Sequence, residues 1–197
     1  MGSKGIDGMA NALEISSEEI KFGAIKLISH KCPRTKRGSK IKFEYVKPIN
    51  SIDDWNHEII YSLPKFIETE FALLVHPDGY VIRPDLWKDE FLEYDYIGAP
   101  WPLPTDDYSY RTESGRIVRV GNSVSIRSKR LMDRVAKFEW KEYYGNTNED
   151  GFISVHHRDE LEAEGFKFAP IELAVHFSKE NELPENQGVD SFAFHSL

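Results

Sequence analysis

One uninterrupted apolar run, Phe71-Ala72-Leu73-Leu74-Val75, constrains the fold of this chain more than any other segment. It is short, and the polar, turn-forming sequence His-Pro-Asp-Gly of residues 76–79 follows it directly. A continuous apolar strand is typical of a sheet that is buried on both faces, and such a sheet needs helices above and below it. The run therefore favours an α/β fold.

Strand-like and helix-like segments alternate along the rest of the chain. Residues 41–46 alternate apolar and polar side chains as a half-buried strand does, whereas Ser51 is typical of a helix N-cap. Residues 118–126 predict a further strand, and Asn148 precedes a segment with helical spacing. This order predicts a single domain over residues 9–197 with a mixed, mostly parallel sheet flanked by helices, after a frayed start at residues 1–8.

Composition excludes several classes of partner. The 25 Lys and Arg residues against 33 Asp and Glu give a net charge of −8, which disfavours nucleic acid and anionic membranes because both attract a positive field. The single cysteine cannot form an internal disulfide, and no apolar run is long enough for a transmembrane segment. We expect a soluble, cytoplasmic protein; no feature of the sequence specifies an oligomeric state.

Three short motifs carry candidate chemistry, and each has an ordinary structural alternative. Asp78 follows a strand, where it suits a divalent cation or a sugar hydroxyl, but Asp-Gly is also a common turn dipeptide. Gly121 interrupts a strand pattern, which indicates either close approach of a ligand or a β-bulge. Glu149 and Asp150 stand at a helix start, where either Asn148 or Asp150 is the cap or a carboxylate acts as a general base.

Taken together, the motifs resemble a family. HPDG, YDYIGAPW, VGNSVSIRS, NEDGF and FAFH occur in the order found in a bacterial and viral glycosyltransferase-like domain of unknown function, from about residue 10 onward. That family resembles GT-A glycosyltransferases, which have a Rossmann-like α/β domain. GT-A domains open with an apolar strand, whereas this chain has only MGSKGIDG before its first helix, so the resemblance implies a sheet without its first strand.

The resemblance also implies a site. Asp150, with Glu149 beside it, would be the catalytic base, and Asp78 and His195 would bind Mn²⁺ or Mg²⁺. His76 stands where the usual metal motif has a first acid. The resemblance places the following residues at the donor: His76, Asp78, Gly79, Gly121, Asn122, Ser123, Ser125, Arg127 and Trp101.

The implied reaction transfers a sugar from a nucleotide-sugar donor to a glycan or another hydroxyl acceptor. In the inverting scheme, the base removes the acceptor proton while the cation stabilises the departing diphosphate. Two alternatives stay open at this point. One is a noncatalytic carbohydrate- or nucleotide-binding relative of the same fold, and the other is a metal-dependent phosphodiesterase or nucleotidyltransferase.

Overall fold

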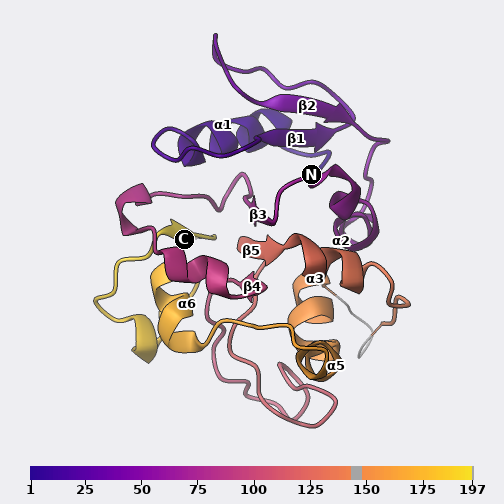
Figure 1. Cartoon of the computed structure of the whole chain (residues 1–197), viewed down its shortest axis with the longest axis vertical. Coiled ribbons are helices and arrows are strands. Elements are labelled where there is room, and N and C mark those ends of the chain that lie inside the picture. The colour runs from indigo at the N-terminus through magenta and orange to yellow at the C-terminus, as the bar shows by residue number, and fades with distance from the viewer. Residues whose placement is uncertain (143–147, 197) are drawn as a thin grey trace.

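The computed structural model describes residues 1–142 and 148–196. Its helices and strands are short (Figure 1). In chain order they are α1 (Ile6–Ser16), β1 (Lys26–Ser29), β2 (Lys42–Tyr45), α2 (Ile52–Tyr61), β3 (Phe71–Leu74), β4 (Tyr96–Ile97), β5 (Ser125–Ser128), α3 (Lys129–Val135), α4 (Glu149–Gly151), α5 (Arg158–Ala163), α6 (Ile171–Phe177), β6 (Ser178–Lys179) and β7 (Ala193–Phe194). Short 3₁₀ turns and one π-helical turn, Phe152–His156, connect them.

Three small sheets replace the expected single one. β1 and β2 pair in parallel, as do β6 and β7, whereas β5 lies between β3 and β4 and is antiparallel to both. The prediction of one mostly parallel, Rossmann-type sheet is therefore not met within the described residues. β3 is an edge strand of its sheet and its four residues are only partly buried, so the apolar run is not covered on both faces.

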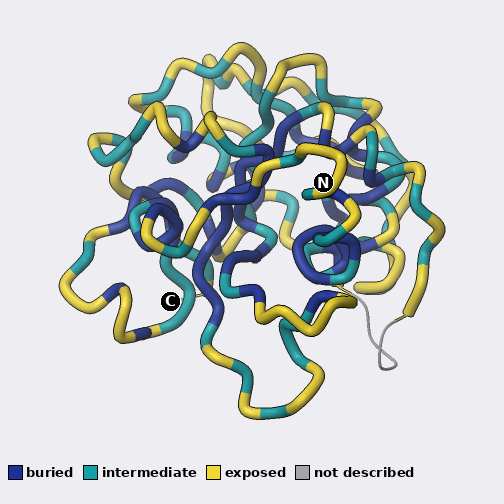
Figure 2. The backbone as a smooth tube through the Cα atoms, turned by 60° about the horizontal axis from the view of Figure 1, so that its bottom comes forward, coloured by how far each residue is buried: buried dark blue, intermediate teal, exposed yellow. Residues whose placement is uncertain are grey.

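Helices nevertheless pack on both faces of the antiparallel sheet. Because side chains alternate along a strand, Tyr96 and Ile97 of β4 face opposite ways. Ile97 belongs to a core cluster with Phe177 of α6, and Tyr96 belongs to a second cluster with Leu131 of α3 and Leu161 of α5. Figure 1 shows α6 and α3 on opposite sides of β4 and β5, and Figure 2 shows the buried positions gathered centrally. The mixed α/β layering that the sequence predicts is present.

Residues 1–8 are tied to β1, in contrast to the frayed start that the sequence predicts. The Gly2 N–H donates to Ile28 O at 3.0 Å, and Ser29 Oγ donates to Gly2 O at 2.6 Å. α1 begins at Ile6, and its Met9 and Ala10 pack against Leu27 of β1. Burial of this apolar face fixes the segment that composition alone marks as loose.

The two predicted helix starts have different outcomes. Ser51 caps α2, because its side chain accepts the Asp54 N–H while the Asp54 carboxylate accepts the Ser51 N–H, the reciprocal pattern of a capping box. At α4, by contrast, Asn148 makes no side-chain cap bond in the described structure. Asn56 of α2 accepts the Glu149 N–H instead, at 3.2 Å. A residue distant in sequence thus takes over the capping role.

Candidate functional site

The turn after β3 is the first part of the candidate site. The N–H groups of His76 and Gly79 each donate to the other's carbonyl oxygen, at 2.6 and 3.2 Å, which leaves Pro77 and exposed Asp78 at the tip. A Cβ atom on Gly79 would lie 2.6 Å from Val124 Cγ2 and 2.7 Å from His195 Cδ2. Glycine is required there because the His195 ring occupies that space.

His195 reaches this turn through backbone pairing at the other end of the chain. The His195 N–H donates to Lys179 O at 2.9 Å, and the Ser196 N–H donates to Asp78 O at 2.8 Å. The His195 ring then meets His76 edge to face, with 5.1 Å between ring centroids. Residues that the sequence predicts separately as donor-binding and metal-binding thus converge.

One potential ligand atom each from His76, Asp78 and His195 lie within 4.8 Å of one another. We call these three side chains the cation group. Burial, together with the positive charge of His195, lowers the pKa of His76 to about 3, so its ring is neutral near pH 7 and keeps a free lone pair. Two imidazoles and one carboxylate suit Mn²⁺ better than Mg²⁺, which prefers oxygen ligands. The residues present therefore fit Mn²⁺.

Two further residues contact His195. Glu180 Oε1 lies 3.1 Å from His195 Nδ1, and Asn122 Nδ2 lies 3.1 Å from the same nitrogen. Burial opposes the charged ring, but the hydrogen bond with Glu180 and the charges of Glu180 and Asp78 raise the pKa of His195. Asn122 is buried with a φ of 87°, an uncommon backbone conformation for a residue other than glycine. Glu180 is a site residue that the sequence reasoning missed.

Asp150 lies in the same electrostatic environment. Burial, together with the negative charge of Glu149, raises the pKa of its carboxyl group to about 7, and the charge of Glu180 adds to this. In turn, the charge of Asp150 contributes to the raised pKa values of His195 and Tyr110. A carboxyl group whose pKa lies near 7 and whose charge acts on His195 is suited to general acid–base chemistry.

Three of the predicted site residues are fully buried. Arg127 Nη2 and Glu149 Oε2 form an ion pair of 2.7 Å, with side chains 1% and 0% exposed. Arg127 Nε also donates to the buried Ser125 Oγ at 2.9 Å. Glu149, expected beside the base, and Arg127 and Ser125, expected at the donor, thus have no exposed surface for a ligand.

Trp101 and Gly121, both expected at the donor, pack against each other. A Cβ atom on Gly121 would lie 2.0 Å from the Trp101 ring, so the indole requires glycine there. Trp101 is 6% exposed and stacks on Tyr110 with 4.8 Å between centroids. Ser123, next to Asn122, is partly exposed. Tyr110, partly exposed and near Asp150, is a second residue that the sequence reasoning did not select.

Comparison with known families decides the affiliation of the chain. Residues 42–195 match a family described as Protein of unknown function (DUF5672). The chain belongs to this family. Comparisons with curated proteins and with solved structures found no match. All members of the cation group, with Glu180 and Asp150, lie within the part that matches DUF5672.

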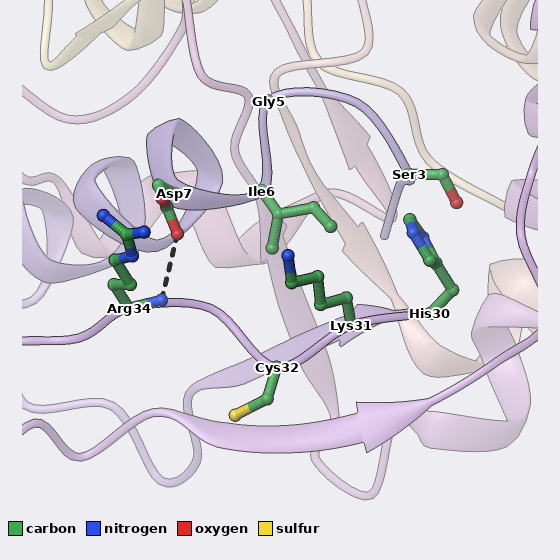
Figure 3. A pocket seen from close by; sticks show the side chains of 8 residues that line it. All are labelled: Ser3, Gly5, Ile6, Asp7, His30, Lys31, Cys32 and Arg34. Carbon is green, nitrogen blue, oxygen red and sulfur yellow. Dashed lines mark hydrogen bonds between the residues drawn. The ribbon is translucent and has the colours of Figure 1, made fainter.

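A cavity of about 340 Å³ lies at the carboxyl end of β1, before the DUF5672 match begins. Figure 3 shows His30 and Lys31 pointing toward the first residues of the chain, with the Arg34 N–H donating to Asp7 Oδ1. Gly5, which lines the cavity, lies near the turn that carries Asp78, because a Cβ atom on Gly5 would lie 3.8 Å from Pro77 Cγ. Its lining residues are Ser3, Gly5, Ile6, Asp7, His30, Lys31, Cys32 and Arg34.

No helix among the described residues is both long enough and apolar enough to cross a membrane.

Proposed function

We propose that this DUF5672 protein is a metal-dependent glycosyltransferase that moves a sugar from a nucleotide-sugar donor to a hydroxyl acceptor. The observation that carries the proposal is the convergence of His76, Asp78 and His195, with potential ligand atoms within 4.8 Å of one another. The carboxyl group of Asp150, whose pKa burial raises to about 7, acts through its charge on His195 of this group. Such transfer needs a base for the acceptor and a cation for the diphosphate, and these residues supply both functions together.

The cation, when bound by His76, Asp78 and His195, neutralises the negative charge that develops on the diphosphate leaving group. Asp150 accepts the proton of the acceptor hydroxyl, which requires its carboxylate form. Tyr110, stacked on Trp101 and near Asp150, provides an aromatic wall on which a sugar ring can pack. In this proposal the GT-A resemblance of the motifs supplies the donor class.

The donor's nucleotide would occupy the cavity beside Pro77. Lys31 and Arg34 are exposed at this cavity and carry positive charge, which favours an anionic ligand in an otherwise acidic protein. Since Gly5 lies near Pro77, this placement puts the nucleotide on the side of the turn that carries Asp78.

Substitution of Asp150 tests the proposal. The donor is first found by thermal shift with UDP-, GDP-, CMP- and dTDP-sugars, each with and without Mn²⁺, because a ligand that binds the native state stabilises it. Asp150→Asn is expected to abolish transfer and sugar release while the donor still binds, and Asp107→Asn, at an exposed position of the long loop, serves as the matched control. In the parent protein the rate should rise as pH increases through about 7.

Three results would contradict the proposal. If Asp150→Asn were as active as the parent protein, Asp150 would not be the base. Cleavage between the two phosphates, rather than between sugar and phosphate, would indicate the phosphodiesterase or nucleotidyltransferase alternative. Donor binding without transfer or hydrolysis would indicate a noncatalytic binding protein.

A further inference from the structure

His195 Nδ1 faces two groups that make opposite demands on it. Glu180 Oε1 lies at 3.1 Å, and an ionised carboxylate accepts hydrogen bonds but cannot donate them. Asn122 Nδ2, also at 3.1 Å, can only donate one. The orientation of the Asn122 amide is fixed, because its Oδ1 accepts the Val124 N–H at 2.8 Å. Nδ1 of a given tautomer therefore satisfies one neighbour and not the other.

The choice between these neighbours decides what the second ring nitrogen offers. In the neutral ring, when Nδ1 carries the hydrogen and donates to Glu180, Nε2 has a free lone pair on the side where Asp78 Oδ1 lies 3.9 Å away. When Nδ1 accepts from Asn122, Nε2 carries the hydrogen and directs it toward Asp78. In the first arrangement Nε2 can bind a cation. In the second arrangement Nε2 carries a hydrogen and cannot bind one.

We propose that Glu180 is the positioning residue that holds His195 in the Nδ1–H tautomer and so presents Nε2 to a divalent cation, with Asn122 favouring the opposite tautomer in the cation-free protein. The inference rests on the cation site of the proposed function, but not on sugar transfer itself. Carboxylates that accept the second N–H of a metal-binding histidine orient the ring and raise its basicity.

The fold holds Glu180 in place for this role. Glu180 follows β6 directly, and Lys179, the last residue of that strand, accepts the His195 N–H through its carbonyl oxygen. Asn181 Nδ2 donates to Glu180 Oε2 at 3.3 Å, which leaves Oε1 for His195. The side chains of Glu180 and His195 are 24% and 18% exposed, so water competes only weakly for their hydrogen bond.

Affinity for the metal alone, measured by calorimetry with Mn²⁺, gives the first test. Glu180→Ala should weaken binding by about 10- to 100-fold, the usual effect of removing such a supporting carboxylate. Glu180→Gln, which keeps an acceptor oxygen, should weaken it less. Glu182→Gln is the matched control, because its side chain is 75% exposed and pairs with Lys179 rather than His195. Unchanged affinity in Glu180→Ala would overturn the inference.

Nitrogen-15 NMR of His195 gives the second test, in the parent protein and in Glu180→Gln, and it does not depend on whether Glu180→Ala folds. With diamagnetic Zn²⁺ bound, the ring should be in the Nδ1–H form. Asn122→Gly, which suits the positive φ and removes the competing donor, should shift the cation-free ring toward the same form. An Nε2–H ring in the Zn²⁺-loaded protein would overturn the inference.

The outcomes separate this inference from the proposed function. If the parent protein binds Mn²⁺ and Glu180→Ala weakens it, but no sugar is transferred, the proposed function fails and the role of Glu180 stands. If transfer occurs and Glu180→Ala binds Mn²⁺ normally, the opposite holds. If the parent protein binds neither Mn²⁺ nor Zn²⁺, the cation site and the role of Glu180 fail together.

Discussion

Two aspartates of this molecule, Asp95 and Asp78, differ in how much of their hydrogen-bonding capacity the protein uses. Asp95 is 4% exposed and accepts hydrogen bonds from Ser128 Oγ at 2.6 Å, Arg130 Nε at 2.7 Å and the Lys167 N–H at 2.8 Å. The Asp78 side chain is 66% exposed, and in the described part of the chain it accepts one hydrogen bond, from Ser196 Oγ at 3.3 Å.

The difference separates a carboxylate that holds the fold together from one that keeps the capacity to bind a ligand. Asp95 joins three segments, and because its oxygens are fully used, it has nothing left for a ligand. Asp78 keeps most of its hydrogen-bonding capacity while two imidazoles converge on it. Two sequence neighbours also differ: the Glu149 carboxylate is fully buried in an ion pair with Arg127, whereas burial raises the pKa of Asp150 to about 7.

The largest expected effect lies on the architectural side, in Arg127→Met. This change leaves the Glu149 carboxylate buried without its partner, and breaking a buried ion pair in this way costs about 3–5 kcal/mol. Urea denaturation should show the lower free energy of unfolding. The double variant Arg127→Met/Glu149→Gln should recover most of the loss, because no uncompensated charge remains. If Arg127→Met were as stable as the parent protein, the ion pair between Arg127 and Glu149 would not stabilise the fold.

A smaller, pH-dependent effect is expected from Asp150→Asn. The pKa of Asp150 rises from 3.8 to about 7 on folding, so the native state binds the proton more tightly and loses stability as pH increases through that window. The amide carries no charge and removes this loss. The variant should therefore melt several degrees above the parent at pH 8 and close to it at pH 4, as measured by calorimetry. A constant difference at both pH values would contradict the raised pKa.

The smallest effect on stability is expected from Asp78→Asn. An exposed carboxylate with one long hydrogen bond contributes little to folding, so the free energy of unfolding should change by no more than about 0.5 kcal/mol. Mn²⁺ affinity, by contrast, should fall by at least about 10-fold, since a ligand matters no less than its supporting residues. Asp107→Asn should alter neither quantity. If Asp78→Asn lowered the free energy of unfolding but left Mn²⁺ affinity unchanged, Asp78 would support the fold, as Asp95 does, and would not be a metal ligand.

Local signals in the sequence were sufficient for part of this description. The α2 cap is confirmed because a serine and an aspartate three residues later satisfy each other without help from the rest of the fold. The prediction of a mostly parallel sheet was wrong for β3, β4 and β5, because strand orientation depends on pairing between distant segments, which no local pattern encodes. Residues 118–124 fail as a strand because close packing, with Gly98 against the Gly121 carbonyl, takes precedence over their β-propensity.

The sequence selected the three residues that the structure brings together, His76, Asp78 and His195. His76, Asp78 and Asp150 stand at the ends of strand or helix patterns, whereas His195 was selected from the family resemblance. Glu180 was not selected, since its only distinction is a hydrogen bond to a histidine 15 positions away. Successive residues of a helix point about 100° apart, so only the three-dimensional structure shows which of Glu149 and Asp150 faces Arg127.

The pairing of Ser196 with Asp78 joins positions that are 118 residues apart. A cation held by His76, Asp78 and His195 would therefore act as a reversible cross-link across more than half of the chain. Because such an ion binds the folded state and not the open one, its concentration would control how often the last strand detaches and becomes a substrate for proteases. Metal supply would then determine the lifetime of this protein as well as its chemistry.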